Sequence, residues 1–138
     1  MALPTSLMLE VVTPVGLLLR ETVDEVIAPG ELGYFGVLPG HTPLLSALGL
    51  GEIKYRQGEL WVHLTCFWGF CEVLPDRVNI LAEIGERAED IDVERAAAAR
   101  DRAAQRMKQI TDETGYQEAH LQYIRAVTRL AVAERRRR

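Results

Sequence analysis

The sequence predicts a β-sandwich followed by an antiparallel pair of α-helices. Short apolar segments separated by turn residues occupy the chain up to about residue 83, and an apolar period of three to four residues begins near residue 91. The charge balance changes with the period: residues 1–84 hold 4 Lys/Arg and 10 Asp/Glu, whereas residues 85–138 hold 12 and 10. We therefore expect two domains, a sandwich over residues 1–86 and a helical hairpin over residues 87–138.

The strands are expected where apolar residues run or alternate between turn signals such as Pro29-Gly30 and Pro39-Gly40. Turns this frequent favour antiparallel pairing, because parallel strands need long crossovers. Alternation places Val78, Ile80 and Ala82 on one buried face. The expected segments are Leu7–Val12, Leu17–Ala28, Val37–Leu38 with neighbours, Leu44–Leu48, Gly51–Tyr55, Leu60–Cys66, Gly69–Leu74 and Val78–Glu83.

The helical part begins after acidic residues, of which Asp90 or Asp92 is suited to cap the first helix. A break is expected over residues 111–115. The apolar stripes are Ala96, Ala99, Ala103, Met107 and Ile110 in the first helix, and Tyr116, Tyr123, Val127 and Leu130 in the second. Since alanine buries little apolar area, the seam between the helices is thin. Two interpretations stay open, a mobile hairpin that acts as a switch and a permanently docked one.

Catalytic and metal chemistry find little support in the sequence. Three histidines are scattered along the chain, and the two cysteines, Cys66 and Cys71, have no partners at metal-ligand spacing. On one extended strand, their odd separation predicts opposite faces, and we interpret both as core or interface thiols. No apolar run reaches the roughly 18 residues that span a bilayer. We predict no catalytic residue and no metal site.

Several motifs in colinear order resemble the signature of ATP synthase epsilon subunits, over almost the whole chain. The main one reads Gly-acidic-hydrophobic-Gly followed by Leu-Pro-Gly-His-x-Pro-Leu. The matching segments are Gly30–Leu45, Val11–Pro14, Gly69–Val73 with Asp76-x-Val78, and Glu86–Asp92. One departure is Phe67-Trp68-Gly69, where relatives usually carry Ser-Gly-Gly, so the neighbouring packing or the partner surface must differ here.

The resemblance implies a sandwich of about ten strands that binds a gamma subunit and rests on the membrane c-ring. It implies a non-catalytic central-stalk subunit of a proton-translocating F-type synthase. Such a subunit couples rotation to ATP synthesis, and its extended hairpin inhibits ATP hydrolysis at the alpha and beta subunits. The implied location is peripheral, at the cytoplasmic face of a bacterial inner membrane.

The contact residues for gamma or the c-ring, carried over by the resemblance, are Glu31, Tyr34, Phe35 and His41. The two aromatic side chains are either exposed anchors or buried in the sandwich. His41, between Pro39 and Pro43, is expected to be a hydrogen-bonded turn residue.

Some epsilon subunits bind ATP through a motif that starts Ile/Leu-Asp-x-x-Arg-Ala. By that resemblance the regulatory ATP site comprises Glu86, Ile91, Asp92, Arg95, Ala96, Arg102, Arg125 and Arg129. With the turn centred near residues 113 and 114, the four guanidinium groups fall within roughly 11 Å along the hairpin. The alternative is a solvated, salt-bridged face. Without a P-loop, ATP would be sensed and not hydrolysed, and no cofactor is required.

The two alternative functions are a nucleic-acid-binding module and a free-standing enzyme. A nucleic-acid-binding module would use the basic run Arg135–Arg138, although the chain as a whole carries a formal charge of −4 and lacks aromatic RNA platforms. A free-standing enzyme would need a triad or a metal cluster, and the scattered histidines do not supply one.

Overall fold

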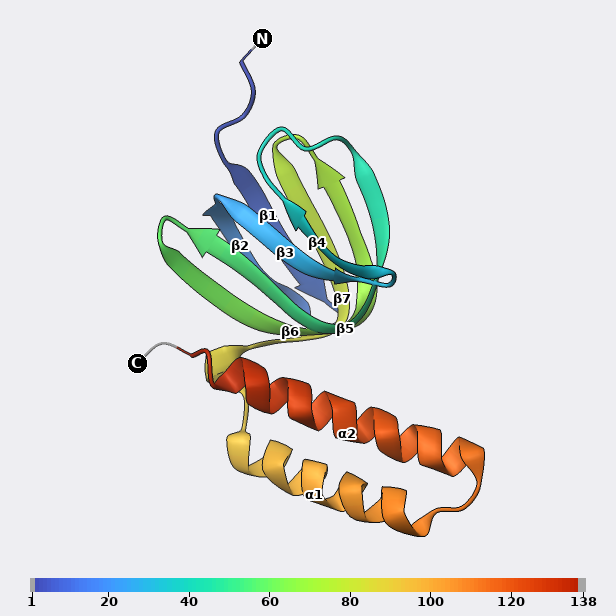
Figure 1. Cartoon of the computed structure of the whole chain (residues 1–138). Helices are drawn as coiled ribbons and strands as arrows, with labels where there is room; N and C mark the ends of the chain where they lie inside the picture. The colour runs from blue at the N-terminus through green and yellow to red at the C-terminus, as the bar shows by residue number, and fades with distance from the viewer. Residues whose placement is uncertain (1, 137–138) are drawn as a thin grey trace. The chain divides into compact units, whose positions relative to one another are not determined.

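A computed structural model describes residues 2–136 as two compact units, the first ending at Arg87 and the second beginning at Ala88 (Figure 1). The first unit contains all the strands. They are β1 (Leu7–Thr13), β2 (Gly16–Val23), β3 (Glu25–Gly30), β4 (Gly33–Val37), β5 (Leu44–Gln57), β6 (Leu60–Leu74) and β7 (Arg77–Arg87).

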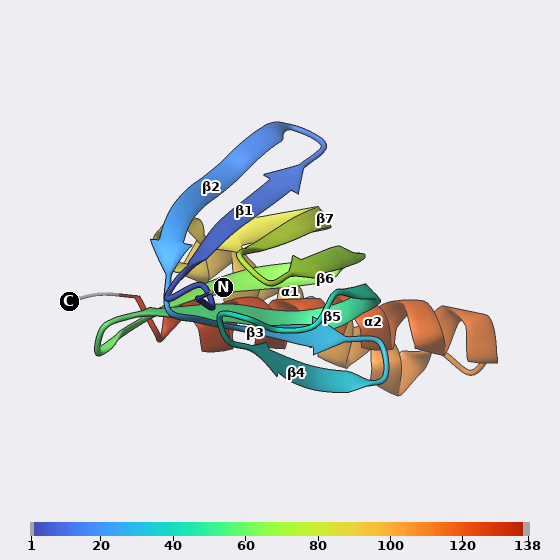
Figure 2. The same cartoon turned by 90° about the horizontal axis from the view of Figure 1, so that it is seen from above.

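The strands form one bent sheet in the order β2-β1-β7-β6-β5-β3-β4 (Figure 2). Neighbouring strands are antiparallel, except that β1 and β7 are parallel. The predicted sandwich is confirmed, with 7 strands in place of about ten. Of the eight segments expected from the residues, four are joined in pairs as β5 and β6, of 14 and 15 residues, and Leu17–Ala28 is divided between β2 and β3.

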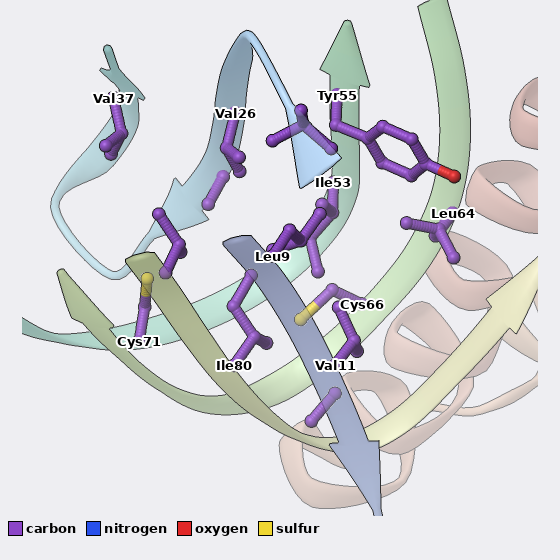
Figure 3. Packing of buried hydrophobic residues seen from close by; sticks show 14 of the residues in the cluster. Leu9, Val11, Val26, Val37, Ile53, Tyr55, Leu64, Cys66, Cys71 and Ile80 are labelled. Atoms are coloured by element: carbon purple, nitrogen blue, oxygen red, sulfur yellow. The ribbon is translucent and has the colours of Figure 1, made fainter. Parts of the chain in front are cut away.

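The sandwich core lies on the concave side of the bent sheet (Figure 3). Every strand contributes side chains to it, among them Leu9 from β1, Ile53 from β5 and Leu64 from β6, all fully buried. Val78, Ile80 and Ala82 are buried as the alternation of β7 predicted. The core is one continuous cluster of mainly aliphatic side chains, so the first unit has the interior of an independent domain.

The alternation of β6 changes at Trp68. Before it, Leu64 and Cys66 point into the sandwich core in regular alternation. Trp68 has φ +61° and Gly69 has φ +147°, and beyond them the inward positions are Cys71 and Val73. The prediction that the two cysteines face opposite sides is therefore wrong. Left-handed backbone between them shifts the alternation by one, and both thiols enter the same core (Figure 3).

The second unit holds a short 3-10 helix η1 (Ala88–Asp90) and two α-helices, α1 (Val93–Gln109) and α2 (Glu113–Ala133), which lie antiparallel (Figure 1). Asp92 caps α1 by accepting a hydrogen bond from the Arg95 amide at 3.1 Å, as one of the two predicted caps. Asp112 caps α2 in the same way through the Gly115 amide at 2.8 Å, so the break is shorter than predicted.

The buried residues of the two helices are mostly alanines. In α1 they are Ala96 and Ala103, seven residues apart, and in α2 they are Ala119, Ala126, Val132 and Ala133. The stripe predicted for α2 is wrong in part, because Tyr116 and Val127 are exposed. The stripe was expected from the spacing of its residues, whereas the positions buried in α2 are mostly alanines, which let two helices approach closely. The predicted thinness of the seam is confirmed.

Candidate functional site

A row of apolar side chains crosses the outer face of the sandwich, from one strand to the next. Leu17 of β2 pairs with Val12 of β1, which pairs with Leu81 of β7. Leu81 pairs in turn with Phe70 of β6, and Phe70 with Ala47 of β5. Paired residues point to the same face, so these five, named here the apolar row, form one continuous strip. Leu17, Phe70 and Leu81 are 57%, 58% and 60% exposed.

The apolar row forms part of a groove of about 730 Å³. Val12, Leu81, Phe70 and Ala47 line it, together with the turn after β1 and the Trp68-Gly69 segment of β6. Large side chains left in water on several neighbouring strands are uncommon on a protein that works alone, and mark a surface for a partner. Leu17, near the start of β2, belongs to this face.

The β3–β4 turn and the first residues of β4 carry three of the four predicted contact residues. Glu31 is exposed and its amide donates to the Ala47 carbonyl at 2.9 Å, which ties the turn to β5. Leu32 at the tip is fully exposed, and the sequence analysis did not single it out. Tyr34 is 61% exposed with its hydroxyl accepting from the Glu52 amide at 3.1 Å, whereas Phe35 is half-buried against the core. Of the two aromatic options, Tyr34 is exposed and Phe35 packs inward.

His41 lies in the segment between β4 and β5. Its Nδ1 is 2.6 Å from the Thr42 carbonyl oxygen, and its amide donates to the Leu38 carbonyl at 3.2 Å. These two local hydrogen bonds are those of a turn residue, as predicted. The ring nitrogen is thus engaged by backbone.

Arginines from both helices surround a second hollow, of about 300 Å³, in the hairpin. It is named here the arginine pocket, and its lining consists of Ala99, Arg102, Arg106, Gln122, Arg125, Ala126 and Arg129. Three of the four arginines predicted for the ATP site therefore line one hollow. Guanidinium groups around a confined space create a positive potential, and their planar forks match the oxygens of phosphate groups.

The other residues of the predicted ATP site lie elsewhere. Glu86 belongs to β7 in the first unit, where its carboxylate accepts the Thr65 hydroxyl at 3.0 Å. Ile91 is buried with Ala88, Val132 and Ala133 in a small core of the second unit. Asp92 caps α1, Arg95 is exposed in its first turn, and Ala96 is buried. None of these five lines the arginine pocket.

Four residues of the arginine pocket were not among the predicted site residues: the small Ala99 and Ala126, and the polar Arg106 and Gln122. The Arg106 guanidinium donates to the Gln122 side-chain oxygen at 2.6 Å and links α1 to α2. A signal for Arg106 was present, since it lies four residues after Arg102 and so on the same helical face. Gln122 could be found only once the alignment of the two helices was known.

Both cysteines are free and buried. Burial raises the pKa of both Cys66 and Cys71 to about 12, so the thiols stay protonated and unreactive at neutral pH. Within residues 2–136, no three His, Cys, Asp or Glu side chains gather closely enough to hold a metal ion. Among the described helices, none has the length and apolar character needed to cross a bilayer.

The sequence matches two family profiles in succession. Residues 6–88 match the profile described as "ATP synthase, Delta/Epsilon chain, beta-sandwich domain". Residues 89–134 match "ATP synthase, Delta/Epsilon chain, long alpha-helix domain".

Proteins described as ATP synthase epsilon chains are similar to this chain over most of their length. The chain is 49% identical to the ATP synthase epsilon chain of Syntrophobacter fumaroxidans, over 92% of this chain and 95% of that one. It is 44% identical to the epsilon chain of Solibacter usitatus, over 97% and 100%.

A solved structure has the same fold. It is a chain in the cryo-EM structure of the Euglena gracilis mitochondrial ATP synthase, with a TM-score of 0.82 and 22% identity, over 95% of this chain and 83% of that one. Sequence profiles, close relatives and fold agree over nearly the whole length, so the chain belongs to the delta/epsilon family of ATP synthase subunits and, within it, to the epsilon chains.

Proposed function

We propose that this chain is a non-catalytic subunit of the central stalk of a proton-translocating ATP synthase, where it joins a gamma subunit to the c-ring. The observation that carries the proposal is the apolar row, whose five strands form a rigid platform for another subunit. The resemblance to epsilon subunits supports a gamma subunit as that partner. Neither the row nor the family favours the nucleic-acid alternative, and Arg137 and Arg138 of its basic run lie outside the described residues.

Replacing Phe70 by alanine is expected to weaken binding of the gamma subunit by about tenfold, because an exposed aromatic at the centre of a contact carries much of its energy. Calorimetric titration of the purified gamma subunit into the wild-type and variant chains measures the change. Leu60→Ala is the matched control, since Leu60 lies on the same strand, is 39% exposed and is outside the groove. Failure of the wild-type chain to bind gamma would refute the proposed function.

The β3–β4 turn is proposed as the contact with the c-ring. Its exposed Glu31, Leu32 and Tyr34 combine a charge with apolar surface, and the hydrogen bonds of Glu31 and Tyr34 to β5 hold the turn rigid. Through this contact the chain would lie peripherally at the cytoplasmic face of a bacterial inner membrane. His41 would support the neighbouring segment as a turn residue.

The hairpin is proposed as the regulatory element, with ATP as its ligand. A triphosphate in the arginine pocket would contact both helices at once and so stabilise the packed hairpin. The alanine seam supports this, because helices held by little apolar area separate at low cost in free energy. ATP favours the packed form only by its differential affinity for the two forms. Once apart, the helices would reach the alpha and beta subunits and slow hydrolysis.

Removal of residues 88–138 is expected to raise ATP hydrolysis by the reconstituted complex severalfold when ATP is limiting. The cut follows the boundary between the two units, so the sandwich keeps its own core and its apolar row. The ATPase rate is compared between complexes with the full chain and with the shortened one, after equal incorporation has been verified. An unchanged rate would rule out the inhibitory role and leave the stalk role standing.

A further inference from the structure

Trp68 occupies a backbone conformation that side chains disfavour. Its φ of +61° makes it the one residue other than glycine with positive φ in residues 2–136. The left-handed region crowds Cβ against the following carbonyl, so a glycine would be the low-energy choice here. A strained residue persists where the surrounding structure holds it, and such residues gather at functional sites.

The left-handed backbone at Trp68 affects the groove on the outer face of the sandwich. The left-handed residue interrupts the regular alternation of β6, and Trp68 lies half-buried in the lining of the groove. At the next residue, Gly69, the backbone of β6 lies so close to the Leu81 carbonyl of β7 that a side chain would collide with it. The indole thus enters the wall of the same groove that the apolar row lines, where a glycine would leave the groove wider.

The charges around the groove have one sign. Glu31 and Glu83 line it and are exposed, and residues 1–84 together carry a formal charge of −6, from 4 Lys/Arg and 10 Asp/Glu. An apolar surface bounded by carboxylates is complementary to an apolar ridge bounded by basic side chains.

From these observations we infer that Trp68 is a specificity-determining residue of the groove. The groove receives from the partner subunit an apolar ridge flanked by lysine or arginine, with its smaller side chains opposite the indole. The inference rests on the proposed function, in which the partner is the gamma subunit. Beyond that function, the inference names the residue that selects the partner, and it states that the partner surface is apolar with basic side chains beside it.

The test compares the full wild-type chain with Trp68→Gly. Affinity for the purified gamma subunit of the same complex is measured by calorimetry, and the thermal midpoint by near-UV circular dichroism. The variant is expected to bind gamma about tenfold more weakly, while its midpoint stays equal or rises because glycine relieves the strain. Trp61→Ala is the matched control. It removes the other tryptophan of β6, which stacks under Lys54 at 5.0 Å outside the groove, and should keep the affinity within about twofold.

The charge part is tested with Glu83→Gln against Glu59→Gln, which alters an exposed carboxylate outside the groove. Only Glu83→Gln is expected to weaken binding of gamma and to reduce the dependence of that binding on salt.

Equal affinity of Trp68→Gly and wild type would overturn the inference while the proposed function stands. So would a loss of affinity together with a lower midpoint, since Trp68 would then act through stability. A wild-type chain that does not bind gamma would overturn both.

Discussion

Replacing Gly69 by alanine is expected to lower the free energy of unfolding of the sandwich by about 3 kcal/mol or more. A Cβ at this position would lie 1.9 Å from the Leu81 carbonyl oxygen and 3.0 Å from the Ala82 Cα. Both atoms belong to the backbone of β7, so no side-chain rotation relieves the collision. The φ of +147° adds strain of its own, because it lies in a region essentially restricted to glycine.

Gly33→Ala provides the control that separates the two causes. Gly33 has φ +138°, but a Cβ there would have nothing within 4 Å. Its loss of stability should therefore be about 1–2 kcal/mol, from backbone strain alone. Urea unfolding followed by tryptophan fluorescence measures the first unit selectively, since Trp61 and Trp68 both lie in it. Equal losses in the two variants would show that β6 and β7 do not approach closely at Gly69.

Replacing both Arg102 and Arg129 by alanine is expected to weaken ATP binding by about a hundredfold or more. Each removes a charged donor from the arginine pocket, and a hydrogen bond to a charged group contributes about 1.5–3 kcal/mol. Alanine is the strongest helix former, so the helices should persist. Calorimetric titration of the isolated chain with ATP measures the affinity, and helix content is checked by far-UV circular dichroism.

Arg100→Ala is the matched control for the arginine pocket. Arg100 lies on the same helix, its guanidinium is paired with Asp101 at 3.0 Å, and it lies outside the pocket. Its loss should change the affinity by less than about twofold, because exposed ion pairs contribute little. A further variant, Arg106→Ala, should weaken binding as a single change. Undetectable binding by the wild-type chain at millimolar ATP would remove the site altogether.

The sequence was sufficient for the features that depend on neighbours along the chain. The change of apolar period separated strands from helices, and the alternation of Val78, Ile80 and Ala82 identified a buried face. The acidic residues before the first helix narrowed its cap to Asp90 or Asp92, of which Asp92 is the cap. Each of these features depends on residues within one strand or within one or two turns of a helix. Over such short distances the direction of a side chain follows from the geometry of its own backbone.

The tertiary structure decided what depends on register between distant segments. Leu17 and Leu81 come into one row only because β2, β1 and β7 pair as they do, and Gln122 meets Arg106 only through the alignment of the two helices. Left-handed backbone at Trp68 interrupts the alternation of β6, and Cys66 before it and Cys71 after it lie in the same core. A periodic pattern specifies directions relative to its own backbone, whereas contacts between segments depend on how those backbones are placed, which is settled by packing over the whole unit.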